Sequence, residues 1–108
     1  MAKGERLTCY VTQEAKDEID RVGRSIEKKR GRLSKAYRVL MRLAFENPDA
    51  DIRNFPGDED QTCSLDATAQ EVAQLDDYQD HHELGERRRG FKKALLQGLS
   101  VHLERERR

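Results

Sequence analysis

The sequence of 108 residues predicts a mainly helical protein with one short N-terminal strand, paired antiparallel with a second copy of that strand. Over residues 6–11, apolar and polar side chains alternate, which is typical of a strand. From residue 13 onward, apolar residues recur at spacings of three and four, which is typical of amphipathic helices. A single strand leaves its backbone groups unpaired. We therefore expect it to pair with the same strand of another chain, or with an internal degenerate repeat.

Composition limits the size of the core and the class of protein. Hydrophobic residues make up 35% of the chain, charged residues make up 39%, and there is no Trp. So little apolar material predicts either a core shared between chains or a loose segment. No apolar run approaches the roughly 20 residues that a membrane span needs. The absence of an export signal and the presence of two cysteines predict free thiols in the cytoplasm.

The formal net charge of zero hides a strong separation of charge along the chain. Residues 1–42 carry 12 Lys and Arg against 6 Asp and Glu, and residues 87–108 carry 8 against 2. Residues 43–86, in contrast, carry 1 against 13. Basic segments attract polyanions. An overall balance of charge therefore does not exclude a nucleic-acid partner.

The predicted strand has two different faces. Because side chains in a strand alternate, one face carries Leu7, Cys9 and Val11, and the other carries Arg6, Thr8 and Tyr10. Thr12 then follows as a predicted N-cap of a helix over about residues 13–29.

A second helix is predicted over about residues 35–46, with Ser34 as its N-cap and Asn47-Pro48 as its end. We expect a third helix that Ser64 or Asp66 caps, and a last helix over about 91–104. Gly98 lies within this last helix, where Gly costs about 1 kcal/mol relative to Ala.

Three regions follow from these elements. Residues 1–46 form a strand-helix-helix unit, residues 47–61 an acidic linker, and residues 62–108 a helical C-terminal region.

The N-terminal unit resembles the ribbon-helix-helix (Arc/methionine-repressor-like) family of DNA-binding proteins over residues 6–46. The resemblance is carried by the segments R-L-T-C-Y-V-T-Q-E-A-K-D-E-I and G-R-L-S-K-A-Y-R-V-L-M-R-L. It implies a two-stranded ribbon whose outer side chains read bases in the major groove. The matching base-reading positions are Arg6, Thr8 and Tyr10. The resemblance also implies phosphate contacts at the start of the second helix, from Arg32, Ser34 and Lys35, together with Lys3.

The C-terminal region has two interpretations. Residues 62–104 are either a helical tail for oligomerisation or partner binding, or a degenerate second strand-helix-helix unit. For the second interpretation, Thr62–Ala69 can be aligned with Thr8–Ala15 at an offset of 54, which places Asp66 at the cap and Asp60, Thr62 and Ser64 on the outer face. The weakness of this match favours the tail.

Candidate metal and catalytic groups are sparse. His81 and His82 are adjacent and therefore point in different directions on a helix, so we expect a solvated face and not a metal site. We expect neither an enzyme nor a cofactor, because the chain has no Gly-rich phosphate loop and no nucleophile with a base nearby in the sequence. The cluster Arg87–Arg89 with Lys92 and Lys93 either grips phosphate or pairs with the acidic 58–86 segment.

The sequence therefore predicts a dimeric or pseudo-dimeric protein that binds specific double-stranded DNA sequences. Repression of a promoter, often its own, is the expected task. A role at a plasmid origin, in a relaxosome or in partition, is a second task of the same binding class. An antitoxin with an N-terminal DNA-binding half and a C-terminal toxin-binding half is a further alternative.

Overall fold

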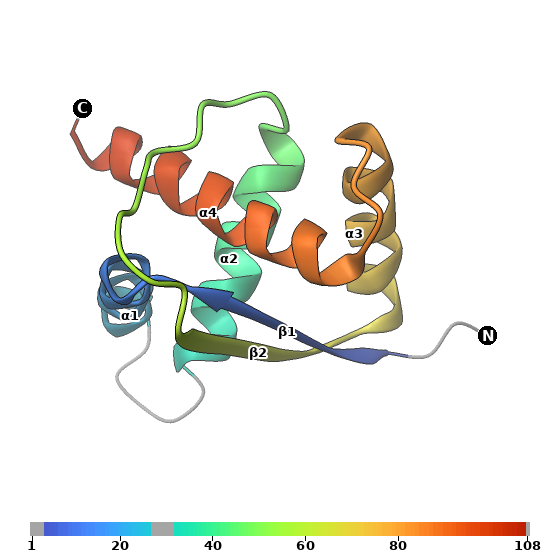
Figure 1. Cartoon of the computed structure of the whole chain (residues 1–108), viewed down its shortest axis with the longest axis horizontal. Coiled ribbons are helices and arrows are strands. Elements are labelled where there is room, and N and C mark those ends of the chain that lie inside the picture. The colour runs from blue at the N-terminus through green and yellow to red at the C-terminus, as the bar shows by residue number, and fades with distance from the viewer. Residues whose placement is uncertain (1–3, 27–31, 108) are drawn as a thin grey trace.

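The computed structural model describes residues 4–26 and 32–107, and within these residues it contains two strands and four helices (Figure 1). In chain order the elements are β1 (Glu5–Val11), α1 (Gln13–Ile26), α2 (Arg32–Glu46), β2 (Gln61–Ala67), α3 (Ala69–His81) and α4 (Arg87–Glu106).

The prediction of one short N-terminal strand is wrong, because a second strand, β2, lies in the same chain. β1 and β2 pair antiparallel over their full length and form a two-stranded ribbon. Thr8 lies opposite Ser64 at the centre of the ribbon, and Glu5 lies opposite Ala67 at one end. The backbone groups of β1 thus find their partner within the chain, without a strand from another copy.

β2 is a strand because its side chains alternate as those of β1 do. Cys63, Leu65 and Ala67 are buried, whereas Thr62 and Asp66 are exposed. Ser64 and Asp66, predicted as helix caps, therefore lie on the ribbon.

The cap of α3 is Thr68, whose Oγ1 accepts a hydrogen bond from the backbone N–H of Glu71 (3.2 Å). The Glu71 carboxylate accepts one in return from the backbone N–H of Thr68 (2.8 Å). This reciprocal pair is a capping box, and it fixes the point at which the strand ends and the helix begins.

The other helices agree with their predicted limits in part: α1 begins at Gln13 as predicted, and its predicted residues 27–29 lie outside the described residues. Thr12 caps α1 as predicted, since its Oγ1 accepts a hydrogen bond from the backbone N–H of Ala15 (3.2 Å). α2 begins at Arg32, so Ser34 lies inside its first turn and is not the N-cap. α4 begins at Arg87, four residues before the predicted start, and extends to Glu106.

The two halves of the chain have the same order of elements, strand-helix-helix. β1 and β2 are offset by 56 residues, as are the two capping residues Thr12 and Thr68. The offset of 54 proposed from the sequence is therefore wrong for the strand by two residues. Residues 61–106 form a second strand-helix-helix unit packed on the first, and not an extended helical tail.

One continuous core joins the two units. The inner face of the ribbon packs against the helices, and α2 crosses α4 at the centre. The rings of Tyr37 and Phe91 meet edge to face at this crossing, with centroids 6.2 Å apart. Gly98 allows the closest approach, because a Cβ built there would lie 1.8 Å from the carbonyl oxygen of Leu40.

The linker between α2 and β2 is held against the helices by Gln97 of α4, which is 1% exposed. The Gln97 side-chain amide donates hydrogen bonds to the carbonyl oxygens of Pro48 (2.9 Å) and Ala50 (2.8 Å). The Gln97 Oε1 accepts a hydrogen bond from the hydroxyl of Tyr78 (2.5 Å). The linker thus has a fixed path over the face opposite the ribbon.

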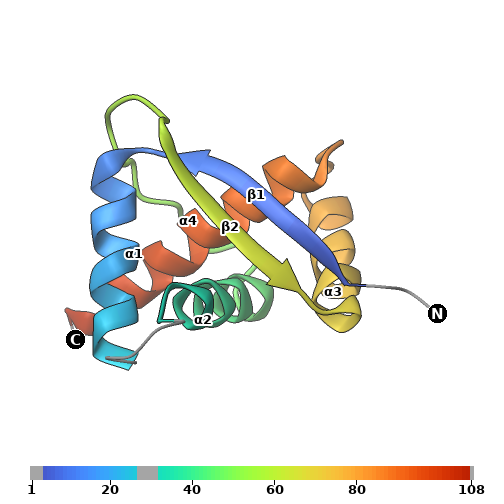
Figure 2. The ribbon, with the colours of Figure 1, turned by 90° about the horizontal axis from the view of Figure 1, so that it is seen from below.

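The ribbon lies at the surface of the molecule, with its inner face towards the helices. In Figure 1, α3 and α4 lie above the two strands and α1 lies beside one end of them, and in Figure 2, seen from below, β1 and β2 cross in front of α4. The outer face of the ribbon is therefore uncovered by any described helix. Among the described residues, no helix has the length and apolar character needed to cross a membrane.

Candidate nucleic-acid interface

The outer face of the ribbon is built from polar side chains of both strands. β1 contributes the three predicted positions Arg6, Thr8 and Tyr10, and β2 adds Thr62, Ser64 and Asp66. Leu7, Cys9 and Val11 face the core, as the alternation predicted. The structure thus brings all three predicted base-reading side chains to one uncovered surface.

Two side-chain contacts order this face. Thr8 and Ser64 share a hydrogen bond between their hydroxyl oxygens at the ribbon centre (3.3 Å). Towards one end, Arg6 Nη1 lies 3.5 Å from Asp66 Oδ1, with the two side chains 68% and 82% exposed. A pair so exposed stabilises the fold by at most a few tenths of a kcal/mol, on the order of other solvated ion pairs. Both groups are thus available to an external partner.

At the other end of the ribbon, Tyr10 lies opposite Thr62. The Tyr10 side chain is 44% exposed, one of the few large apolar surfaces open to solvent among the described residues. Lys16 of α1 donates a hydrogen bond to the backbone carbonyl oxygen of Thr62 (2.6 Å) and so fixes β2 against α1. The Tyr10 end of the ribbon therefore exposes an aromatic ring, whereas the Arg6 end exposes a positive and a negative charge.

The start of α4 lies beside the start of β1. Arg87 joins the two elements, because its guanidinium contacts Glu5 (2.6 Å) and also Asp76 of α3 (3.0 Å). Hydrogen bonds to Asp76 and then to Glu5 raise the pKa of Arg87 above its ordinary value. Arg88 and Arg89 are exposed, and neither forms an ion pair with any other described residue.

The cationic cluster of α4 thus divides into two groups. Arg87 pairs with Asp76, and Lys92 pairs with Glu59 (2.6 Å), so both meet the acidic 58–86 segment. Arg88 and Arg89 follow Arg87 in the first turn of α4, and their charges are not paired with any described residue. The sequence alone does not indicate which of these three contiguous arginines forms ion pairs and which do not.

The start of α2 lies at the other flank of the ribbon (Figure 1). Ser34 is half-buried and Lys35 is exposed in its first turn. Arg38, one turn later, donates a hydrogen bond to the carbonyl oxygen of Asp66 (2.8 Å) and ties the helix to β2. The predicted contacts of Lys3, and of the Arg32 side chain, lie outside the described residues.

Sequence reasoning gave a second ribbon strand only as the interpretation that it did not favour, and it assigned no base-reading residue to β2. Two signals mark it: the alternation of Cys63, Leu65 and Ala67, and the capping box of Thr68 with Glu71, which excludes a helix start before residue 68. The predicted outer set of Asp60, Thr62 and Ser64 is displaced by two residues, so Asp66 takes the place of Asp60.

The histidine pair takes part in packing and hydrogen bonding away from the ribbon. His81 Nε2 lies 2.9 Å from Asp49 Oδ1, and the His82 ring packs edge to face on Tyr78. Burial is the first cause that lowers the pKa of His82. Within the described part of the chain, no group of three or more His, Cys, Asp or Glu could hold a metal ion.

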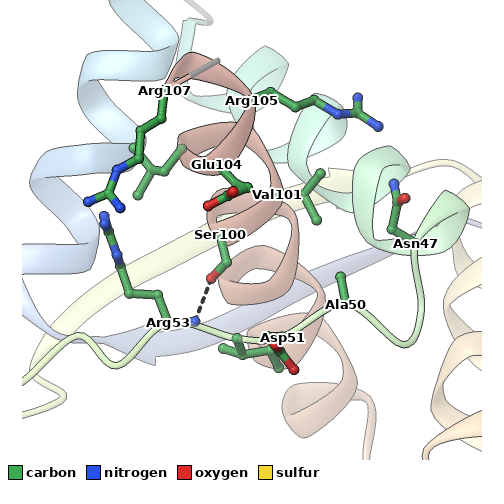
Figure 3. Close-up of a pocket in the computed structure, with 11 residues that line it drawn as sticks. Asn47, Ala50, Asp51, Arg53, Ser100, Val101, Glu104, Arg105 and Arg107 are labelled. Atoms are coloured by element: carbon green, nitrogen blue, oxygen red, sulfur yellow. Dashed lines mark hydrogen bonds between the residues drawn. The ribbon is translucent and has the colours of Figure 1, made fainter.

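A surface pocket of about 580 Å³ lies between the linker and the C-terminal half of α4. Figure 3 shows Arg53 of the linker and Arg107 at the end of α4 directed towards each other across it. The backbone N–H of Arg53 donates to Ser100 Oγ (2.8 Å), which fixes the linker wall. No residue of the outer ribbon face lines this pocket.

Comparison with known proteins gives no assignment: no family model matches the chain, and neither a curated protein nor a solved structure matches it.

Proposed function

We propose that this protein binds specific double-stranded DNA sequences by inserting its ribbon into the major groove. The observation that carries the proposal is the two-stranded antiparallel ribbon with an uncovered polar face, formed by β1 and β2. The major groove is wide enough for such a ribbon, and each base pair presents there a distinct pattern of donors and acceptors. The groups that would contact the base edges are the guanidinium of Arg6, the hydroxyl of Thr8 and the phenol of Tyr10.

Two helix starts flank the ribbon and support the proposal. The first N–H groups of a helix are unpaired and attract anions, and the helix dipole adds to this effect. At the start of α4, Arg88 and Arg89 add exposed charge, and at the start of α2, Ser34 and Lys35 lie in the first turn. Phosphates on either side of the groove would then meet one helix start each.

This arrangement is the one expected of a ribbon-helix-helix protein whose two units lie in one chain. The C-terminal half supplies β2 and a share of the core. That role favours DNA binding by the whole chain over an antitoxin tail that is free to wrap a toxin. We propose repression of transcription, including autoregulation, as the task, with the marking of a plasmid origin as the second role within the same binding class.

The DNA site of such a protein has unequal halves. In a ribbon of two identical strands, both ends present the same side chains. Here the offset of 56 sets Thr62 in the place of Arg6 and Asp66 in the place of Tyr10. We therefore propose a non-palindromic site, bound in one orientation.

The direct test is the binding of a pool of random duplexes, followed by fluorescence anisotropy at increasing salt. The proposal expects an enriched sequence and an affinity that falls steeply with salt, because phosphate contacts release counterions. Failure to bind any duplex at low salt would contradict the proposed function.

Replacing both Arg88 and Arg89 by Ala is expected to weaken binding to all duplexes about equally. Phosphate contacts carry no base information, so the sequence preference is retained. The slope of log affinity against log salt should fall by about 2, or about 1 for each lost contact. The matched control replaces Arg105 and Arg107 by Ala at the far end of the same helix, which removes equal charge but is expected to leave the slope unchanged. Equal effects of the two double variants would argue against this phosphate site.

A further inference from the structure

The inner face of the ribbon carries two cysteines in direct opposition. Cys9 of β1 and Cys63 of β2 are register partners, and both are fully buried. Opposed residues of an antiparallel pair have Cα atoms about 4.5 or 5.5 Å apart. Both separations lie within the range that a disulfide bond spans. The two thiols therefore need no change of strand register to become bonded.

Two polar groups surround this pair. Lys16 Nζ donates a hydrogen bond to the hydroxyl oxygen of Tyr37 (3.0 Å). The charge of Lys16 and a hydrogen bond of Tyr37 both act on Cys63. A hydrogen bond from Cys9 is the first cause that lowers the pKa of Cys63, to about 7, and the charge of Lys16 acts in the same direction. The same hydrogen bond, and then burial, raise the pKa of Cys9 well above its ordinary value. One sulfur is thus prepared as a nucleophile and the other retains its proton.

We propose that Cys9 and Cys63 are a redox pair that a hydroperoxide converts into a cross-strand disulfide bond within one chain. The Cys63 thiolate attacks one oxygen of hydrogen peroxide, the O–O bond breaks, and the hydroxide that leaves is protonated to water. Cys63 is then a sulfenic acid. The Cys9 sulfur attacks it, the S–O bond breaks, and a second water leaves with the Cys9 proton. Two thiols and one peroxide thus give one disulfide and two waters.

The burial of both sulfurs determines which products form. Because Cys9 is already in place, the sulfenic acid is resolved within the chain before a further peroxide reaches it. Because neither sulfur is exposed, disulfide bonds to another chain are excluded. The bond closes a loop between residues 9 and 63 across the whole N-terminal unit, which restricts the unfolded chain.

The test treats the native, reduced chain with hydrogen peroxide and follows free thiols and intact mass. The intact mass should fall by the mass of two hydrogens, and a non-reducing digest should contain a disulfide-linked Cys9–Cys63 peptide. The chains should stay free of disulfide bonds to one another throughout. The melting temperature should rise by about ten degrees or more, and a reductant should reverse the rise. Cys9→Ser should give sulfenic and sulfinic acid at Cys63 instead. Sulfinic acid in the unsubstituted chain, disulfide-linked dimers, or a bond that forms only in denaturant would each overturn the proposal.

A second variant tests the part played by Lys16. Lys16→Met is expected to slow oxidation roughly tenfold at pH 7, because less thiolate is present. The pH at which the oxidation rate rises should also shift to a higher value. Lys93→Met makes the same substitution on α4 and should leave the rate unchanged, with melting curves confirming that both variants fold. An unchanged pH profile in Lys16→Met would overturn the role assigned to this lysine. The thiol measurements need no DNA, so their outcome is independent of the proposed function.

Discussion

Gly98→Ala is expected to destabilise the fold by about 3 kcal/mol or more, a large share of the stability of a small domain. The added Cβ would lie 1.8 Å from the carbonyl oxygen and 2.5 Å from the carbonyl carbon of Leu40, both backbone atoms of α2. No side chain can rotate away from such a contact, so α2 and α4 must separate. Because this crossing lies at the centre of the core, the loss should appear in urea unfolding followed by circular dichroism.

Gly85→Ala is the matched control, because nothing lies within 4 Å of a Cβ built at Gly85. Its effect should stay within about 0.5 kcal/mol. Helix propensity alone predicts the opposite result for Gly98, a gain of about 1 kcal/mol on substitution by Ala. A Gly98→Ala variant as stable as the unsubstituted chain would therefore contradict the close crossing of α2 and α4.

Arg6→Ala is expected to reduce affinity for the selected DNA site by about tenfold to a hundredfold. A bidentate contact from arginine to guanine contributes about 1–3 kcal/mol of discrimination. The exposed pair with Asp66 does little to hold Arg6 in place, so the fold should keep its stability. The measurement is fluorescence anisotropy on the selected duplex and on a scrambled duplex of the same composition.

The comparison of the two duplexes decides what Arg6 does. Arg6→Ala should lower affinity for the selected duplex much more than for the scrambled one, whereas Arg105→Ala should affect neither by more than about twofold. Arg6→Lys keeps the charge but loses the planar fork, so it should restore non-specific affinity and not the preference. An equal loss on both duplexes for Arg6→Ala would place this side chain on phosphate.

The N-terminal unit was the more predictable half of the fold. In residues 6–46, local signals agree with one another: strict alternation, a Thr12 cap, a stripe at helical spacing and an Asn47-Pro48 stop. The start of α2 was predicted three residues late because Ser34 is a good cap by type, yet the helix had already begun at Arg32. Terminal turns are the least determined part of a helix.

The C-terminal unit was less predictable, because β2, although as long as β1, mixes Ser64 and Asp66 with its apolar residues. Those two residue types favour helix caps locally, and only pairing with β1 determines that they lie on a strand. Tertiary contacts likewise determine the role of Gly98 and the opposition of Cys9 to Cys63. No local pattern encodes which backbone crosses a glycine, or which residue faces another across a ribbon.

The central claim is that one chain forms a complete DNA-reading ribbon. Size-exclusion chromatography with light scattering, on the chain alone and with a short duplex that holds one selected site, tests it most directly. The account predicts 12.5 kDa for the free chain at micromolar concentration and, for the complex, the mass of one chain plus one duplex. A free chain of twice that mass, or a complex that forms only with two chains on one site, would contradict it.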